Sequence, residues 1–369
     1  MPLSIAFLID ELGSGGAQRQ ICMLALELSK RGYLVEITCY YPNIWYQDHL
    51  LRENVTVRVI TWRNQIEKLI KVRRTLRTLK ADAVISFLKG PNLLNIIGAL
   101  PERLWKTIIA ERTTDTLPLS YKNRIYFMLY RFSDAIVVNS STQLEILRKT
   151  VPTLSGKLKL IRNCVDLDKF YPRTDRDVSG RPLIFGLLAS YYPHKRPSDL
   201  IKAVEILAGR LGNRTPNFIW CGENIDHATR SYTEEFQKCS RMIRDKQLEG
   251  FITLRGPTVL PEIFLDGTDC VCLFSDREGF PNVICEAFAS GKPCVATRVG
   301  DIPFLIRDGV TGFTIESASP ESIANVLMKM ALIEDNKRLE MGRNARKFAE
   351  EHLSIKSTCD EYLELIHST

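Results

Sequence analysis

Long apolar runs are missing from this 369-residue chain, and none approaches the roughly 20 residues that a membrane-spanning helix needs. The first apolar stretch, Leu3 to Ile9, has no basic leader and runs directly into Asp10 and Glu11. We therefore predict a buried strand there and not a signal peptide. The composition, with 45% hydrophobic and 25% charged residues, is typical of a soluble globular protein, and we expect a cytoplasmic one.

Metal-ligand spacing is also missing. The ten cysteines are scattered, and the five histidines show no ligand pattern. Cys270 and Cys272 lie close together, but in an apolar strand alternate side chains point to opposite faces. Two Asp-x-Asp motifs, at 166–168 and 175–177, do not end a strand beside a nucleotide cleft. We predict reduced, buried thiols and no metal site.

The loop from Gly13 to Arg19 lacks the third glycine of a dinucleotide-binding fingerprint, so an NAD-binding interpretation is weak. It does contain Gly15 and Gly16 directly before a predicted helix. A glycine-rich loop at a helix N-terminus offers backbone donors to a phosphate or a sugar. This loop is therefore a candidate ligand contact.

Apolar strand runs alternate with amphipathic helices along the whole chain, which predicts parallel sheets covered on both faces. The length favours two domains with a cleft between them. The predicted strands lie near 4–9, 34–40, 55–60, 83–87, 107–110, 135–138, 183–189, 217–221, 251–255, 270–274, 293–296 and 312–315. A last helical segment is predicted from Asn336 to His367.

The most informative stretch runs from Glu278 to Pro293, where a loop follows a buried strand and leads into a helix. Gly279 has no Cβ, so the backbone can approach a ligand closely. Glu278 precedes the helix and Glu286 lies inside it, so two carboxylates can hold different parts of one ligand. Amides that can face an anion or hydroxyls near the helix start are those of Phe280, Asn282 and Val283.

This stretch closely resembles the donor-binding signature of the retaining, GT-B-fold glycosyltransferases of family 4, and the resemblance covers nearly the whole chain. It implies an α/β protein with two Rossmann-like, doubly wound domains facing a cleft. Residues 1–170 would be the acceptor domain, with about 350–369 crossing back onto it, and 171–349 the nucleotide-sugar donor domain. The proline-containing run 172–182 resembles the linker, and the domains are expected to close around donor and acceptor.

The resemblance also implies roles for single residues. Lys195, with glycine-loop amides, would stabilise the leaving diphosphate, Glu278 would contact the donor hexose, and Glu286 would hold the ribose hydroxyls. The turn at Thr258 corresponds to the place where the family holds the base. The implied donor contacts are Gly15, Gly16, Ser190, Lys195, Arg196, Thr258, Glu278, Gly279, Phe280, Pro281, Asn282, Val283 and Glu286.

Three positions depart from the family pattern. Ser190 stands where the family usually has an arginine, and Arg196 is the candidate replacement. Gln18 replaces a common glutamate in the glycine-rich loop. Many relatives carry a histidine after the fifth strand, whereas this chain has Glu111 and Arg112, which are our candidates for catalytic or acceptor contact on this domain.

Charge is uneven, because residues 1–170 carry 25 Lys and Arg against 15 Asp and Glu, a net +10, and the remainder nets −3. The excess gathers in a predicted amphipathic helix at 63–80, with a second candidate at 121–132. Such helices suit an anionic membrane surface. Ordinary solvated helix faces explain them equally well. A nucleic-acid partner is less favoured, since no recognised binding module surrounds these charges.

We therefore predict a glycosyltransferase that moves a sugar from a UDP-linked nucleotide-sugar to a glycan or lipid-linked glycan in cell-surface polysaccharide or lipopolysaccharide synthesis. The transfer would retain the anomeric configuration and need neither metal nor cofactor. One alternative is a sugar-nucleotide epimerase of the same fold. The other is a non-catalytic partner subunit, conceivable because the loop arginine and the histidine are missing.

Overall fold

The computed structural model describes residues 2–13, 15–43, 45–112, 121–173, 181–226 and 231–368. The chain forms two compact units. The N-terminal unit comprises Met1–Cys164 and Ile355–Thr369, and the second unit comprises Val165–Ser354. The sequence predicts these boundaries at 170 and near 350.

The N-terminal unit is built on a parallel sheet of seven strands in the described residues, in the order β3-β2-β1-β4-β5-β6-β7. The strands are β1 (Ser4–Leu8), β2 (Leu34–Cys39), β3 (Thr56–Val59), β4 (Ala83–Phe87), β5 (Lys106–Glu111), β6 (Ala135–Val138) and β7 (Leu158–Leu160). The helices are α1 (Gly16–Lys30), α2 (Gln47–Arg52), α3 (Gln65–Leu79), α4 (Lys89–Ala99), α5 (Tyr121–Tyr130), α6 (Ser141–Thr150), η1 (Pro152–Lys157) and α14 (Ile355–His367).

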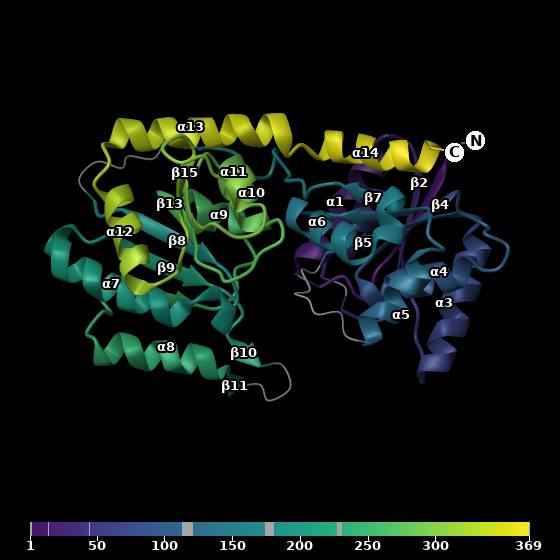
Figure 1. Ribbon diagram of the computed structural model, residues 1–369, viewed down its shortest axis with the longest axis horizontal. Coiled ribbons are helices and arrows are strands. Elements are labelled where there is room, and N and C mark those ends of the chain that lie inside the picture. Colours follow the sequence, from purple (N-terminus) through teal and green to yellow (C-terminus); the bar gives the residue numbers. More distant parts are fainter. Residues whose placement is uncertain are drawn as a thin grey trace. The chain divides into compact units, whose positions relative to one another are not determined.

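Two hydrophobic layers cover this sheet. Helices α1 and α14 pack on one face, where Ile21 and Tyr362 share a core with Phe7. Helices α3 and α4 pack on the other, around Leu76 and Leu94. Helix α4 lies between α3 and α5, as Figure 1 shows. Because both faces are covered, the central strands β1 and β4 are almost entirely apolar, whereas the edge strands β3 and β7 carry Arg58 and Lys159.

The second unit has a parallel sheet in the order β12-β9-β8-β13-β14-β15 and a separate antiparallel hairpin, β10-β11. Its strands are β8 (Ile184–Leu188), β9 (Asn217–Cys221), β10 (Ile225–Asp226), β11 (Ser231–Tyr232), β12 (Ile252–Arg255), β13 (Cys270–Leu273), β14 (Cys294–Thr297) and β15 (Gly312–Ile315). The helices are η2 (Pro193–Lys195), α7 (Pro197–Leu211), η3 (Gly212–Arg214), α8 (Glu234–Asp245), α9 (Pro261–Asp266), α10 (Asn282–Ala289), α11 (Ile302–Leu305), α12 (Pro320–Ala331) and α13 (Asp335–His352).

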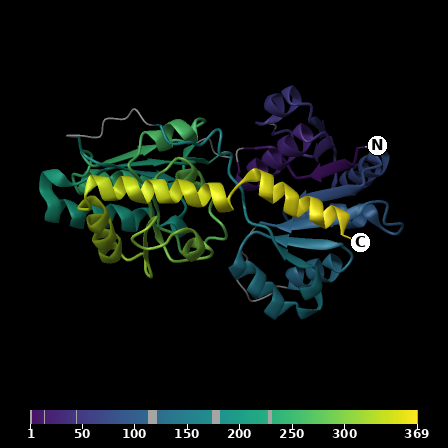
Figure 2. The same ribbon diagram turned by 90° about the horizontal axis from the view of Figure 1, so that it is seen from above.

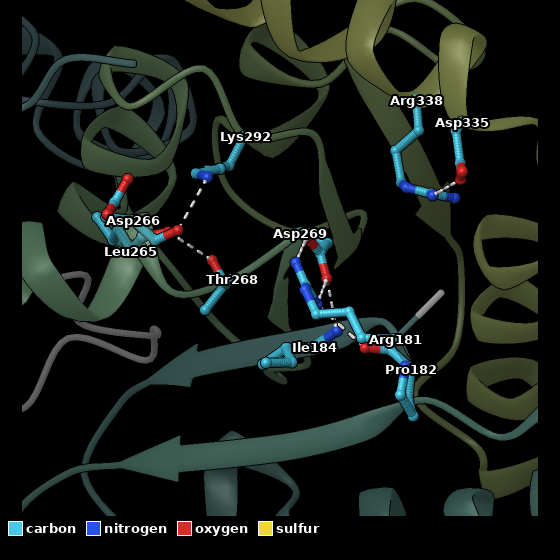
Figure 3. A network of polar contacts seen from close by, with 10 residues as sticks. All are labelled: Arg181, Pro182, Ile184, Leu265, Asp266, Thr268, Asp269, Lys292, Asp335 and Arg338. Carbon is cyan, nitrogen blue, oxygen red and sulfur yellow. Dashed lines mark hydrogen bonds and ion pairs between the residues drawn. The ribbon is translucent and has the colours of Figure 1, made fainter. Parts of the chain in front are cut away.

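The chain starts this sheet at β8 and adds β9 and β12 on one side and β13, β14 and β15 on the other. Neighbouring strands β8 and β13 therefore form the topological switch point. An ion pair fastens their amino ends, since Arg181 binds Asp269 through two hydrogen bonds of 2.7 and 2.8 Å (Figure 3). Asp269 Oδ2 also accepts from the Ile184 amide at 2.7 Å. This contact holds the central strand pair in place.

The predicted strands are confirmed to within one or two residues, and β7 and the β10-β11 hairpin are additional. The predicted terminal helix is wrong as a single element. It breaks at Leu353 into α13 and α14, because the buried Leu353 gives its carbonyl to the Val165 amide at 2.9 Å. Helix α14 packs against α1 within the N-terminal unit (Figure 2).

The same contact explains the first boundary. Val165 forms a bridge with Ser354, and its side chain shares a core with Phe170 and the second unit's α10. Residues 165–170 therefore belong to the second unit. Most of the predicted linker, 174–180, lies outside the described residues. None of the helices in the described parts of the chain combines the length and the apolar character that crossing a membrane requires.

Candidate active site

The candidate site lies at the carboxyl end of the second unit's switch point. The loop after β8 contains Ser190 and Lys195, and the loop after β13 contains Asp276 and Glu278. Open α/β sheets bind ligands in the crevice beyond the carboxyl ends of strands at such a point. Two segments more than 80 positions apart in the sequence thus meet where a ligand is expected.

Lys195 and Glu278 form an ion pair, with 2.5 Å between Nζ and Oε1. Both side chains are largely, but not completely, withdrawn from water. Because two charges in partial burial interact strongly, the pair fixes both side chains in the same small volume. The structure therefore brings together two residues for which the resemblance implies separate contacts with the donor.

A buried tyrosine holds the first loop. The Tyr191 hydroxyl lies 2.7 Å from the Trp220 carbonyl and accepts from the Arg255 amide at 3.1 Å, and its ring stacks on Trp220. Burial raises the pKa of Tyr191, so the hydroxyl stays protonated. Trp220 Nε1 donates to the Ala189 carbonyl at 2.6 Å. A Cβ on Gly222 would lie 1.9 Å from that same carbonyl, so only glycine allows this approach.

A glycine also holds the second loop. Gly300 has φ +56°, and a Cβ there would lie 2.2 Å from the Glu278 carbonyl oxygen and 2.7 Å from that of Gly279. The Asp301 amide donates to the Gly279 carbonyl at 3.0 Å. The 299–301 turn thus sets the backbone of Glu278. Sequence reasoning missed Tyr191, Gly222 and Gly300, although a glycine soon after a strand was a usable signal for two of them.

Replacing Gly300 with alanine should displace the Glu278 backbone and lower kcat by at least about tenfold, since a shift of about 1 Å near reacting atoms can cost that much or more. Gly309→Ala is the matched control, because Gly309 has φ +75° but nothing within 4 Å of an added Cβ. The control should lose only the roughly 1–2 kcal/mol of stability that a left-handed backbone costs other residues. Equal kcat values for the two variants would show that Gly300 does not position Glu278.

Helix α10 supplies the remaining predicted donor contacts of this loop. Its N-cap residue is Pro281, and Asn282 and Val283 form its first turn. Phe280 is buried and packs on Phe304 with 6.3 Å between ring centroids. The first-turn amides of a helix have no intrahelical acceptors and can serve a ligand.

Glu286 lies one turn into α10, with 5% of its surface exposed. The resemblance implies that Glu286 binds the ribose hydroxyls of the donor, and this role stays a prediction.

Arg196, the candidate replacement for the missing arginine, is held by two carboxylates in this structure. Its Nε lies 2.6 Å from Asp276 and its Nη1 3.2 Å from Asp199. Ser190 is half-buried, and the Thr258 hydroxyl accepts from the Leu260 amide at 3.2 Å. Whether these three residues contact a donor stays a prediction.

The glycine-rich loop belongs to the N-terminal unit. Gly15 is the N-cap residue of α1 and Gly16 its first residue, as predicted for a helix start, and Ser14 lies outside the described residues. Gln18 turns back, and its Nε2 donates to Asp10 Oδ1 at 3.4 Å.

Glu111 and Arg112 are both engaged inside the N-terminal unit. Glu111 is 3% exposed and accepts a hydrogen bond from the Tyr130 hydroxyl, and burial raises its pKa. Arg112 donates to Asn163 Oδ1 at 2.6 Å and to the Tyr362 hydroxyl at 2.7 Å. Arg112 thus ties α14 to its unit, and a role of either residue in acceptor contact stays a prediction.

Metal-ligand residues do not gather anywhere in the described chain, where no group of three or more His, Cys, Asp or Glu could hold an ion. The Asp-x-Asp sequence at 166–168 forms a local turn, in which Asp166 Oδ1 accepts from the amides of Asp168 and Lys169 at 3.0 and 2.9 Å. The 175–177 motif lies outside the described residues. The independence of the reaction from metal remains a prediction.

Two family models match the chain. The model described as "Glycosyltransferase Family 4" matches residues 14–169, and "Glycosyl transferases group 1" matches residues 173–348. Together they cover both units.

The curated relatives that the chain matches are less than 30% identical to it. The D-inositol 3-phosphate glycosyltransferase of Corynebacterium glutamicum (strain R) is 28% identical over 230 residues, which is 59% of this chain and 53% of that protein. The N-acetyl-alpha-D-glucosaminyl L-malate synthase of Bacillus anthracis is 29% identical over 128 residues, 35% of this chain and 33% of that protein. The matched stretches thus span about half the length of the first relative and a third of the second.

Solved structures share the fold along the whole chain. Anabaena Alr3699/HepE in complex with UDP-glucose superposes with a TM-score of 0.84 at 19% identity, covering 100% of both chains. WaaG, a glycosyltransferase involved in lipopolysaccharide biosynthesis, gives a TM-score of 0.72 at 16% identity, covering 99% of this chain and 100% of that one. At such low identity these likenesses establish the GT-B fold.

Proposed function

Because the chain belongs to the group 1, or family 4, glycosyltransferases, we propose that it transfers a sugar from a UDP-linked nucleotide-sugar to a glycan or lipid-linked glycan acceptor. The observation that carries the proposal is the ion pair of Lys195 and Glu278 at the switch point. The relatives' names and the neighbour in complex with UDP-glucose support this donor class.

The ion pair suits departure of a diphosphate. Lys195 offers an ammonium point charge to the leaving group as negative charge develops on it. When Lys195 binds the diphosphate, its ion pair with Glu278 breaks. The Glu278 carboxylate can then accept hydrogen bonds from hydroxyls of the donor hexose and stabilise a cationic sugar centre. The bond between the anomeric carbon and the diphosphate breaks, the new bond forms to the acceptor oxygen on the same face with retained configuration, and the proton of the acceptor hydroxyl passes to the departing diphosphate oxygen.

Exchange of Glu286 for alanine tests donor binding. Since the ribose is present in UDP and UDP-glucose alike, the variant should bind both about 10- to 100-fold more weakly, as expected when a charged hydrogen bond of about 1.5–3 kcal/mol is lost. Isothermal titration calorimetry measures both affinities. Glu321→Ala, at an exposed helix position, is the control. Unchanged UDP affinity in a folded Glu286 variant would remove Glu286 from the site.

Two alternatives differ in product. A sugar-nucleotide epimerase would convert the donor alone into its epimer, whereas a transferase releases nucleoside diphosphate in proportion to acceptor. A non-catalytic subunit would do neither. The intact Lys195, Glu278 and Glu286 argue against the non-catalytic subunit, and an assay with and without acceptor glycans separates the three.

A lipid-linked acceptor requires a membrane contact, and α3 offers a surface for one. Ile66 and Ile70 on this helix are 72% and 60% exposed, between exposed Arg63, which directly precedes the N-cap Asn64, and exposed Arg74. Apolar side chains flanked by cations suit an anionic leaflet. On α5, which α4 separates from α3, Ile125 and Met128 are also exposed. The side chains of 121–124 lie outside the described residues.

The basic character of α3 has a second origin. Arg73 Nη2 and Arg77 Nη2 both donate to the Leu100 carbonyl at the end of α4, at 2.8 and 2.9 Å. Lys71 donates to the Thr61 carbonyl at 2.9 Å and pairs with Glu67. These three cations therefore stabilise their own unit, and the proposed membrane surface is limited to the stripe from Arg63 to Arg74.

A further inference from the structure

The carboxyl edge of the N-terminal sheet brings aromatic and acidic side chains together. Strands β3, β2 and β1 are neighbours, so the residues that follow them lie in the same lateral order. These residues are Trp62 after β3, Tyr40 and Tyr41 after β2, and Asp10 and Glu11 after β1. None of them is used in the donor site of the other unit.

Tyr41 is an exposed ring in a fixed orientation. Its amide donates to the Asp10 carbonyl at 2.9 Å, which joins the second loop to the first. Its ring packs against Tyr40, with 5.1 Å between centroids, and against the edge of Trp62 at 5.8 Å. Nevertheless 40% of Tyr41 remains exposed. Because the Tyr41 ring is already fixed in the free protein, little side-chain entropy is lost when a ligand stacks on it.

The neighbouring aromatic rings are locked by other contacts. Trp62 Nε1 donates to the Tyr40 carbonyl at 2.8 Å. The Lys68 ammonium lies 4.9 Å from the centroids of both the Tyr40 and the Trp62 ring. Since Lys68 covers these two rings, Tyr41 is the ring left for a ligand in this cluster.

Two carboxylates, those of Asp10 and Glu11, belong to the loop after β1, and the Asp10 carbonyl of this loop accepts from the Tyr41 amide. Asp10 Oδ1 accepts from the Glu11 amide at 2.9 Å and from Gln18 at 3.4 Å. The Leu12 amide donates to the Asn43 carbonyl at 2.8 Å, which joins the acidic loop to the aromatic one. Gly13 leaves room for the Glu11 carboxylate, because a Cβ at this position would lie 2.7 Å from Glu11 Oε1. Ionised carboxylates only accept hydrogen bonds, so they require a ligand that brings donors.

We propose that Tyr41, Asp10 and Glu11 form the acceptor subsite and bind a pyranose ring that carries no anionic group. The C–H face of the sugar stacks on Tyr41, and its hydroxyls donate to the two carboxylates. An apolar platform with a few polar groups at its rim is the usual composition of a small-molecule site. This inference rests on the proposed function and adds the class of the acceptor's reacting residue.

The absence of an anionic group follows from the charges. A phosphate or carboxylate on the sugar would face Asp10 and Glu11, and like charges close together are strongly unfavourable. The ammonium of Lys68, which covers the Tyr40 and Trp62 rings, is engaged there. The site therefore selects against phosphorylated sugars by repulsion.

Saturation-transfer NMR on the full chain tests the proposal. The probes are the methyl α-pyranosides of glucose, galactose and mannose, together with the 6-phosphate of each. At least one neutral glycoside should bind, with Tyr41→Ala weakening it about tenfold, as for a central aromatic contact. Tyr41→Phe should bind normally because the ring is kept, and Glu11→Gln should bind more weakly. Tyr171→Ala, another exposed tyrosine, is the matched control and should bind normally.

The proposal is overturned if no neutral glycoside binds, if Tyr41→Ala binds as well as the native chain, or if the 6-phosphates bind more tightly than the neutral sugars. Calorimetry with UDP on the same samples separates this inference from the proposed function. If UDP binds but no glycoside does, only the acceptor subsite is refuted. If neither UDP nor any glycoside binds, both the acceptor subsite and the proposed function are refuted.

Discussion

Glu278→Gln should lower kcat by on the order of 10² while leaving the affinity for UDP nearly unchanged. The glutamine keeps the shape of the side chain but removes the charge that pairs with Lys195 at 2.5 Å and that would face the reacting sugar. The loss should therefore appear in the chemical step and not in nucleotide binding. Steady-state kinetics with UDP-glucose and calorimetry with UDP measure the two effects.

Glu205→Gln is the matched control for this change. Glu205 also pairs with a lysine, Lys246, at 2.6 Å in the same unit, but on the surface at helix α7. Loss of an exposed ion pair costs about 0–1 kcal/mol of folding stability, and it should leave kcat unchanged. If Glu278→Gln behaves like this control, Glu278 has no part in the chemistry, and a binding role for the pair becomes the better explanation.

The second large effect concerns membrane binding. A variant with Arg63 and Arg74 changed to Gln, and Ile66 and Ile70 to Ser, should bind anionic liposomes at least about 30-fold more weakly at low salt. The two cations alone would contribute about 1 kcal/mol each. Sedimentation with vesicles containing phosphatidylserine measures the loss, and UDP affinity should be unaffected.

The control removes two exposed cations from another helix of the same unit, Arg148→Gln with Lys149→Gln on α6. It makes the same change in net charge, so it separates a local surface from general attraction between a basic unit and an anionic membrane. If both variants lose binding equally, α3 is not the contact. If the native protein ignores anionic liposomes at low salt, a soluble glycan becomes the better acceptor.

The strands and loops could be predicted because their signals are local. Uninterrupted apolar runs separated by helical periodicity place every long strand, and the order strand, loop, helix places Lys195 and Glu278 after strands β8 and β13. Strand β7, with exposed Lys159 at its centre, is only three residues long and gives no such run.

The remaining features depend on partners distant in sequence. The break at Leu353 requires the Val165 amide, and Gly300 matters only because the Glu278 carbonyl lies against it. Arg73 and Arg77 look like solvated cations on a helix, but they bind a carbonyl that a different helix presents. No local pattern separates a cation that faces water from one that caps a neighbour.

All ten cysteines are buried, and burial raises the pKa of Cys39 to about 11 and of Cys239 to about 12. Thiol reagents attack the thiolate, so the native chain should remain unlabelled by maleimides while it is folded. A cysteine introduced at exposed Lys149 in one unit and another at Glu321 in the other would then be the two sites that react. The chain as it stands is thus a ready background for paired spin labels or fluorophores that follow donor-induced motion.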